Sequence, residues 1–357
     1  MIRLTARQFR TQAIVAAIAL MIAAVVLAVT GANLAHLYTT TVASCQARND
    51  CSTATSAFLS TDGQLQTALD VLMVAIPALL GIFWGAPLIA RELEAGTHRL
   101  AWTQSVTRAR WLAVRIGVVG ICSLLVTGLF SLMVTWWFGP LDRAGMSIFG
   151  SFDQRDVVPI GYAAFAFALG VTSGALLRRT LPAMATTLAG FVAIRLAVVE
   201  WLRPNLATPV HRTVLDTVLG SLSSGQHGSV TAAQVTAAQG GVPANAWLLS
   251  DQTINGAGHV IGQNGLLNGA MNFYPSAGGY GLTLQGAGTC RNVSVGPPAN
   301  PGMDIQKCLA QLNVRDVLTY QPAGRYWPFQ WDELGIFLAL SLIVVGLSFW
   351  WIRRRVN

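Results

Sequence analysis

The sequence predicts an all-α integral membrane protein with six transmembrane helices, cytoplasmic N and C termini, and a large extracellular insertion, α+β or mostly irregular, between the fifth and sixth helices. Three observations predict this fold class. Of the 357 residues, 53% are hydrophobic and only 11% are charged, whereas soluble domains carry about 25% charged residues. Six apolar stretches approach the roughly 20 residues of helix that cross a bilayer. Arginines concentrate on one side of these stretches, which indicates their orientation.

The six spans follow from apolar runs with few ionisable side chains. They are expected at 12–35, 69–90, 112–137, 158–177, 181–201 and 333–352. The first could instead be a secretory signal, because it follows a basic start and ends in small residues. Signal peptides have apolar cores of roughly 7–15 residues, whereas Ala13 to Leu34 is uncharged throughout. A retained helix is therefore favoured.

Arginine placement predicts which side is cytoplasmic. Basic residues in short loops stay inside the cell. With the N-terminus inside, the cytoplasmic segments hold 13 basic residues and only Glu92 and Glu94 as acids, while the other side holds nine basic and 13 acidic residues. The cytoplasmic set is Arg3, Arg7, Arg10, Arg91, Arg99, Arg108, Arg110, Arg115, Arg178, Arg179, Arg353, Arg354 and Arg355.

The scarcity of lysine excludes one class of protein. Of the 23 basic residues only Lys307 is a lysine, and a cysteine follows it. A P-loop needs a lysine followed by Ser or Thr to reach the nucleotide phosphates. The chain therefore cannot be a P-loop ATPase by itself.

Four of the five cysteines lie in predicted extracellular loops. An even number facing an oxidising compartment is typical of disulfides. Sequence neighbours make Cys45–Cys51 and Cys290–Cys308 the least costly of the three possible pairings. Cys122 lies inside the third span, where a small core residue is expected. No Cys-x-x-Cys or His-x-x-x-His spacing occurs, so no metal site is predicted.

Arg195 is the one basic residue well inside a predicted span. Such residues are usually paired and face protein or water. Its candidate partners are Asp70, at the outer end of the second span, and Glu200 on the same helix, although a spacing of five residues faces poorly. Arg195 could line a substrate path, or it could form a structural ion pair or extend toward the membrane surface. The sequence leaves these alternatives open.

Residues 202–332 are too long for an ordinary connection and are predicted to fold as a module. Charge is low, and apolar segments recur. Val214, Leu215, Val218 and Leu219 have helical spacing, whereas Gly281 to Leu284 alternates as a strand does.

The segment between the second and third spans predicts a helix, a break, a short surface helix and the next span. Gly96 can end the first helix, an amphipathic helix can follow over Thr97 to Gln104, and Ser105 or Thr107 can cap the third span. This shape is suited to being moved by another protein. A basic hairpin that only fixes topology is the alternative.

Two segments carry a resemblance to a known family. The run Ile89-Ala90-Arg91-Glu92-Leu93-Glu94-Ala95-Gly96-Thr97, followed by Leu100, Thr103 and Val106-Thr107-Arg108, resembles the cytoplasmic signature of type-2 ABC exporter permeases. The stretch from Tyr320 to Trp331, and the basic end of the last span, look like permeases of this kind from high-GC Gram-positive bacteria. The resemblance does not extend to most of 203–319.

The resemblance implies the membrane subunit of an ABC exporter in a bacterial plasma membrane, not an enzyme in itself. The expected partners are two copies of a cytoplasmic ABC ATPase subunit, a second permease subunit forming a homodimer, and membrane lipid, but no nucleic acid. ATP and Mg²⁺ would bind the ATPase, with no cofactor in this chain. The expected cargo is a hydrophobic or amphipathic drug, lipid or peptide, as in multidrug efflux. A membrane-anchored receptor, scaffold or enzyme whose active part is extracellular is the alternative.

The resemblance also implies roles for individual segments. Residues 1–201 would hold the first five spans, an elbow helix over Met1 to Thr11 and a coupling helix at about 91–110. Residues 202–332 would be the extracellular domain, and 333–357 the last span and basic tail. The step Gly81–Gly85 would allow close packing, naturally against the partner permease. The residues expected to contact the ATPase are Glu92, Glu94, Gly96, Thr97, Arg99, Leu100, Trp102, Gln104 and Arg108.

Overall fold

The computed structural model describes two compact units. The helical unit comprises Met1–Leu206 and Tyr326–Asn357, and the insertion comprises Ala207–Arg325. The described residues are 2–46, 51–95, 107–215, 243, 245–254, 256–263, 266–267, 271–276, 279–284, 293–295 and 315–355.

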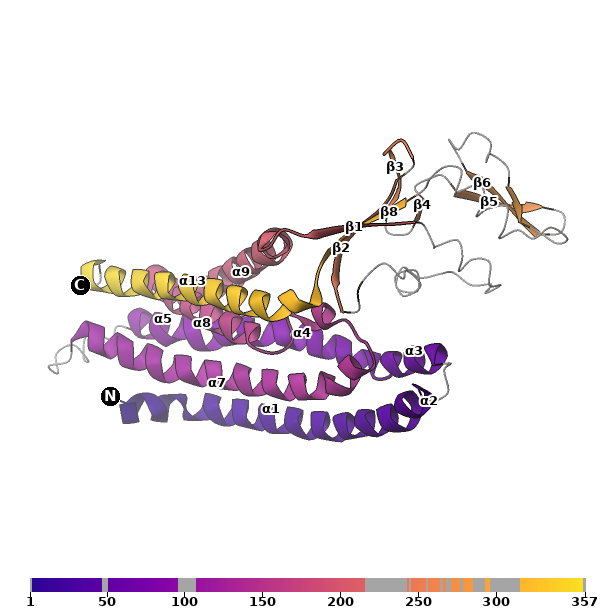
Figure 1. The fold of residues 1–357 in the computed structure, drawn as a ribbon. Coiled ribbons are helices and arrows are strands. Elements are labelled where there is room, and N and C mark those ends of the chain that lie inside the picture. The colour runs from indigo at the N-terminus through magenta and orange to yellow at the C-terminus, as the bar shows by residue number, and fades with distance from the viewer. Residues whose placement is uncertain are drawn as a thin grey trace. The chain divides into compact units, whose positions relative to one another are not determined.

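Six described helices are long and apolar enough to cross a membrane, which confirms the predicted fold of six apolar helices. The six spans are Phe9–Ala43, Gly63–Glu94, Arg110–Arg143, Val158–Leu177, Thr180–Asn205 and Ala323–Arg354. Most extend past the predicted apolar run, because a helix does not have to end where the hydrocarbon does. The start of α1 (Ile2–Leu37) and the end of α13 (Tyr326–Arg355) lie at the same end of the helical unit (Figure 1). This end, which carries Arg10, Arg91, Arg353 and Arg354, is called the basic end below.

The remaining helices follow the chain in order. After α1 come a π-helical turn (Tyr38–Ala43), α2 (Ser44–Gln46), α3 (Ser52–Ser60), α4 (Gly63–Leu80), a second π-helical turn (Gly81–Gly85), α5 (Ala86–Glu94), α7 (Arg108–Arg143), a 3₁₀ turn (Ile148–Ser151), α8 (Val158–Leu177), α9 (Thr180–Ala197), a third π-helical turn (Val198–Leu202) and a 3₁₀ turn (Arg203–Asn205).

The N-terminal region differs from the expected elbow helix. Residues Ile2–Leu37 form one continuous helix, so the basic start and the first span are a single rod. No proline lies within α1, and its first glycine is Gly31. The sequence therefore supplies no residue that would break the helix between an interfacial segment and a span.

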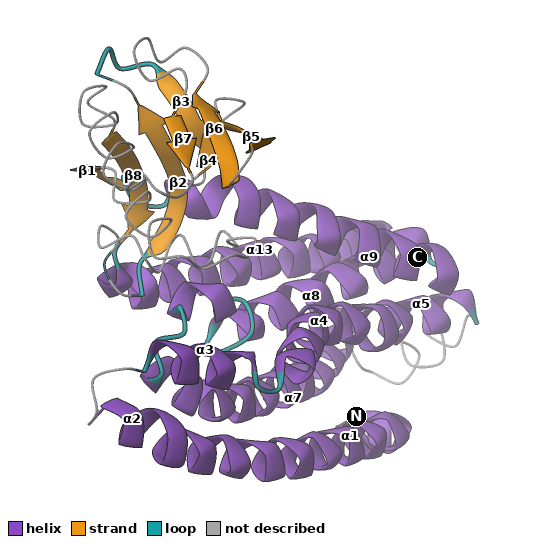
Figure 2. Ribbon diagram, turned by 90° about the vertical axis from the view of Figure 1, so that its right-hand side faces the viewer, coloured by secondary structure: helices purple, strands orange, loops and turns teal. Residues whose placement is uncertain are grey.

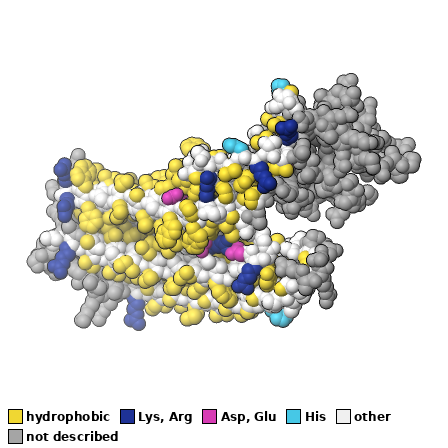
Figure 3. Space-filling model, in the orientation of Figure 1, with side chains coloured by type: hydrophobic (Ala, Val, Ile, Leu, Met, Phe, Trp, Pro, Cys, Tyr) yellow, Lys and Arg dark blue, Asp and Glu magenta, His cyan; other side chains and the backbone are white. Residues whose placement is uncertain are grey.

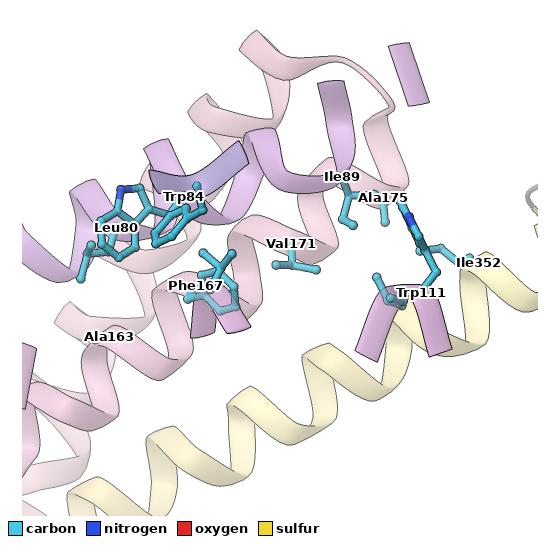
Figure 4. Close-up of a cluster of buried hydrophobic side chains, with 12 residues drawn as sticks. Leu80, Trp84, Ile89, Trp111, Ala163, Phe167, Val171, Ala175 and Ile352 are labelled. Carbon is cyan, nitrogen blue, oxygen red and sulfur yellow. The ribbon is translucent and has the colours of Figure 1, made fainter. Parts of the chain in front are cut away.

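Helix α8 is the centre of the helical unit, with α4, α5, α7, α9 and α13 packed around it (Figure 2). It is apolar on all sides, which is typical of a fully buried helix. Phe167 and Val171 of α8 meet Leu80, Trp84 and Ile89 of the second span in one buried cluster (Figure 4).

Glycines let the second span approach α8 closely. A Cβ at Gly81 would lie 2.5 Å from the carbonyl oxygen of Ala166, and one at Gly174 would lie 2.5 Å from that of Ala86. The step Gly81–Gly85 thus meets the matching step Gly170–Gly174 of the same chain. The close packing predicted for Gly81–Gly85 is present, but it is intramolecular and does not support a permease dimer.

The described part of the insertion is built from antiparallel strands. One sheet has the order β1-β8-β2-β3-β4 and the other β5-β6-β7. The strands are β1 (Val210–Leu215), β2 (Trp247–Ile254), β3 (Val260–Gln263), β4 (Leu266–Leu267), β5 (Met271–Ser276), β6 (Gly279–Leu284), β7 (Val293–Val295) and β8 (Arg315–Gln321).

Strands β1 and β8 pair along their length, from Val210 opposite Tyr320 to Leu215 opposite Arg315. The first and last strands of the insertion are therefore neighbours. Val214 belongs to β1 and not to the helix expected from its spacing, while β6 confirms the alternating segment that ends at Leu284. Residues 218–222 lie outside the described part of the chain.

Apolar side chains occupy much of the visible face of the helical unit, and several Lys or Arg side chains lie at its basic end (Figure 3). On α1, for example, Val15, Met21 and Val29 are each more than 60% exposed. Large apolar side chains at this exposure are typical of a surface that faces lipid or another protein. The helical unit therefore has the surface of a membrane-embedded bundle.

Candidate functional site

The first candidate region is the end of α5, which continues the second span beyond the apolar run. The helix closes with a hydrogen bond from the backbone N–H of Ala95 to the carbonyl oxygen of Arg91. Two of the residues predicted to contact an ATPase, Glu92 and Glu94, lie in this last turn.

Glu92 joins α5 to the start of α7. Its carboxylate forms an ion pair with Arg115, and the two side chains are 18% and 9% exposed. Arg115 also donates to the carbonyl oxygen of Leu88 over 3.4 Å, and its guanidinium lies 5.0 Å from the ring centre of Trp111. A partly buried, multiply held pair fixes geometry better than an exposed pair.

Glu94 joins the same turn to α9. Its carboxylate accepts hydrogen bonds from the backbone N–H of Thr180 over 3.2 Å and from the Thr180 hydroxyl over 2.9 Å. Thr180 is the first residue of α9, where free N–H groups and the helix dipole favour a negative charge. One turn of α5 is thus connected to the beginnings of two other spans.

The segment between α5 and α7 is described only at its margins. Thr107 caps α7, because its side chain accepts a hydrogen bond from the backbone N–H of Arg110 over 3.4 Å. This confirms one of the two predicted caps. Arg108 is the first residue of α7. The other residues predicted to contact an ATPase, Gly96, Thr97, Arg99, Leu100, Trp102 and Gln104, lie outside the described residues.

The second candidate region is a charged cluster at the opposite end of the helical unit, formed by Asp153, Tyr162, Arg195, Arg203 and Glu333. Arg195 forms its ion pair with Asp153 over 3.2 Å, and its guanidinium lies 5.3 Å from the ring centre of Tyr162.

Neither expected partner of Arg195 forms this contact. Asp70 and Glu200 are exposed. The physical reason is that the connection between α7 and α8 folds back over the bundle and brings Asp153 to Arg195. A contact between a loop and a helix has no characteristic spacing in the sequence, so the sequence alone could not predict it.

Arg203 and Glu333 form the buried centre of the cluster. Nε of Arg203 donates to Glu333 over 2.8 Å and Nη2 over 2.9 Å, while the Tyr162 hydroxyl donates to Glu333 over 2.6 Å. Arg203 also pairs with Asp153. Two positive and two negative side chains balance, as a buried charge requires.

The electrostatic effect is visible at Asp153. Burial alone would raise the pKa of this carboxyl, but the guanidinium of Arg203 and, after it, that of Arg195 outweigh burial and hold the pKa below its usual value. Asp153 is therefore ionised at neutral pH.

Further hydrogen bonds hold the loop that carries Asp153. Oε1 of Gln330 accepts from the backbone N–H groups of Val157 and Val158 at the start of α8, and its Nε2 donates to the carbonyl oxygen of Phe152 over 3.0 Å. Arg155 pairs with Asp142 over 2.6 Å, and burial, which lowers the pKa of Arg155, is outweighed by this carboxylate, so that its pKa is raised. The loop is fixed to both α7 and α13.

The sequence interpretation missed Asp153, Tyr162, Arg203 and Glu333. One signal was available. Arg203 lies two residues after the fifth predicted span and Glu333 begins the sixth, so opposite charges flank the insertion at its two junctions with the membrane spans. Charges placed there are expected to pair.

The remaining predicted sites have separate outcomes. The disulfide Cys45–Cys51 is formed, as expected, and Cys122 is a free, half-buried cysteine. Cys290 and Cys308 lie outside the described residues. Within the ranges that the structure describes, no group of three or more His, Cys, Asp or Glu side chains could hold a metal ion. Both candidate regions thus join separate helices through ion pairs and hydrogen bonds between side chains.

Six apolar spans, of which α8 is the buried central one, with both chain ends on one side, define a multi-pass membrane protein. The family model described as ABC-2 membrane transporter related matches residues 17–203, which is more than half of the chain, so the chain belongs to this family. It is a membrane permease of an ABC transporter, and this membership implies association with an ABC ATPase subunit. No curated protein and no solved structure matches the chain.

Proposed function

We propose that the chain is the membrane subunit of an ABC exporter that moves a hydrophobic or amphipathic compound, such as a drug, lipid or peptide, out of a bacterial cell. Two copies of a separate ATPase subunit bind ATP and Mg²⁺ and hydrolyse the nucleotide. Two permease copies form the pathway. The arginine asymmetry supports a basic end in the cytoplasm and an insertion outside.

The observation that carries this proposal is the set of contacts made by the last turn of α5. Glu92 is bound to α7 and Glu94 to α9, and residues 96–106 lie directly between α5 and α7 in sequence. A force that an ATPase applies to this segment would therefore reach three spans together.

Such coupling needs a difference in free energy between two permease arrangements, because a partner with equal affinity for both shifts nothing. The bond from Glu94 to α9 is exposed and short-ranged, so it can break and reform at small cost. The Glu92–Arg115 pair is more buried and would move with both helices. The last turn of α5 thus has one stable connection, to α7 through Glu92, and one that can be broken, to α9 through Glu94.

The experiment is to express the chain with a candidate ABC ATPase, purify the two together, and compare ATP hydrolysis in lipid vesicles. Glu94→Gln weakens the connection to α9, and Gly96→Pro alters the segment itself. We expect both variants to keep the ATPase bound and to lose stimulation of hydrolysis by at least about fivefold, the lower limit of ordinary coupling energies.

Glu200→Gln is the matched control, because Glu200 is an exposed acid in the π-helical turn that follows α9, at the other end of the span from Thr180. It should leave hydrolysis unchanged. The proposal is wrong if no ABC ATPase binds the chain, or if assembly and stimulation survive both changes in the α5 segment.

A further inference from the structure

Two adjoining hollows lie between α1, the second span and α7. The polar hollow has a volume of about 380 Å³ and is lined by Gln12, Arg91, Glu92 and Arg115 among others. The apolar groove has a volume of about 580 Å³. Gln12, Phe83 and Trp84 line both, so the two are continuous. Each volume lies in the range of roughly 300–1,000 Å³ that is typical of ligand sites.

The apolar groove has the length of one leaflet. On α1 its lining runs from Thr11 to Ala23, which is about 18 Å of helix at 1.5 Å per residue. The hydrocarbon of one leaflet is about 15 Å deep, half of the bilayer core. Ala16 and Ala19 face the groove, and their small side chains leave it open.

The lining of the groove suits an acyl chain in its chemistry as well as in its length. Apart from Thr11 and Gln12, every lining side chain is aliphatic or aromatic. An extended acyl chain can lie along such a surface without leaving a polar group unpaired.

The polar hollow supplies the charge for a headgroup. It lies at the basic end, where Phe9 begins the first span and Arg91 is near the end of the second. Glu92 and Arg115 neutralise each other. Arg91 is exposed and forms no ion pair with any described carboxylate, which leaves the hollow with one net positive charge. The amide of Gln12 is a further donor at the junction with the groove.

From this arrangement we propose that the site binds an anionic glycerophospholipid of the surrounding membrane, with one acyl chain in the apolar groove and the phosphate at Arg91. A lipid chain gains no hydrophobic energy by leaving the bilayer for the groove. Selectivity therefore comes from the headgroup, and the groove decides only whether a chain fits. The proposal is independent of the ATPase, and its test uses the permease alone.

Trp84 lines both hollows and can report occupancy. The purified chain is placed in phosphatidylcholine vesicles that contain increasing fractions of phosphatidylglycerol with brominated acyl chains, which quench nearby indoles. Trp84→Phe identifies the part of the quenching that depends on Trp84. We expect this part to reach half-saturation at an about fivefold lower fraction of brominated phosphatidylglycerol than of brominated phosphatidylcholine, the factor that one arginine contributes near an anionic surface.

Two pairs of variants separate this site from general membrane charge. Arg91→Gln should abolish the preference, whereas Arg353→Gln, an exposed arginine elsewhere at the basic end, should keep it. Ala19→Leu should reduce quenching by either lipid, whereas Ala17→Leu, on an exposed part of α1 outside the groove, should not.

Three results would overturn the proposal. The first is equal quenching by the two brominated lipids with the unmodified chain. The second is equal loss of the preference in Arg91→Gln and Arg353→Gln. The third is efficient cross-linking of two copies through Ala19→Cys, since it would place protein in the groove.

Discussion

Replacing Glu333 with glutamine is expected to lower the stability of the helical unit by about 3 kcal/mol. Glu333 is fully buried, and it accepts hydrogen bonds from Arg203 over 2.8 and 2.9 Å and from Tyr162 over 2.6 Å. Glutamine keeps the shape of the side chain but removes its charge. Arg195 and Arg203 must then share Asp153.

The size of the effect follows from the burial of this pair. Removing one partner of a buried ion pair costs about 3–5 kcal/mol, because the other charge remains uncompensated. Asp153 still pairs with Arg203, which places Glu333→Gln at the lower limit. At roughly 2–4 °C per kcal/mol for a unit of this size, the melting temperature should fall by about 6–12 °C.

The assay is thermal unfolding of the purified chain in detergent, followed by circular dichroism. Glu200→Gln is the matched control, because Glu200 is an exposed acid near the end of the fifth span, which also carries Arg195 and Arg203, and it should leave the melting temperature unchanged. The double variant Arg203→Gln with Glu333→Gln restores the balance of charge, so its loss should be smaller than the sum of the two single losses. An unchanged melting temperature in Glu333→Gln, or a strictly additive double variant, would refute the reasoning.

Two further predictions use the same assay. Gly170→Ala places a Cβ 2.8 Å from the backbone nitrogen of Ala86, and it should destabilise the helical unit by about 1–3 kcal/mol. Gly335→Ala meets open space, so it should stabilise the unit slightly. Destabilisation by both variants would contradict the packing argument. The pKa of Asp153 is lower when folded than unfolded, so its contribution is present above about pH 4 and is lost as pH falls below that value. Asp153→Asn should reduce the loss of stability below about pH 4. If stability depends on pH in the same way in this variant, Asp153 is not the source of the loss.

The spans could be predicted from the sequence because the bilayer imposes a length on apolar runs. The third span shows both the success and its limit. Residues 112–137 were expected and α7 covers Arg108–Arg143, since helix formation continues in the headgroup region. Hydropathy does not predict the N-terminal cap of α7, because this cap depends on a hydrogen bond to the hydroxyl of Thr107.

The charged cluster could be predicted only in part, because its members come from four separate stretches of chain. Arg195 was recognised from its burial in a span, but its partner Asp153 lies 42 residues earlier in a loop. Pairing across a folded loop depends on tertiary structure. Opposite charges at the edges of neighbouring spans, such as Arg203 and Glu333, are a more general signal than spacing on one helix.

The glycine steps show why motif and partner are separate questions. Gly81 and Gly85 correctly predicted a close approach, because a missing Cβ allows backbones to meet. A single sequence does not say which helix fills the space. The answer lay in the matching step of α8, Gly170 and Gly174, which repeats the same spacing.

The central position of α8 has a consequence for biogenesis. The last helix, α13, packs against α8, but the fifth span and the whole insertion lie between them in sequence, from Leu177 to Tyr326. At ordinary rates of translation, the ribosome needs on the order of 10 s to synthesise that stretch. During this delay α8 lacks its neighbour α13, and Arg203 has Asp153 but not yet Glu333 as a partner. We therefore expect the newly inserted chain to need the translocon or a membrane chaperone to shield this side of α8.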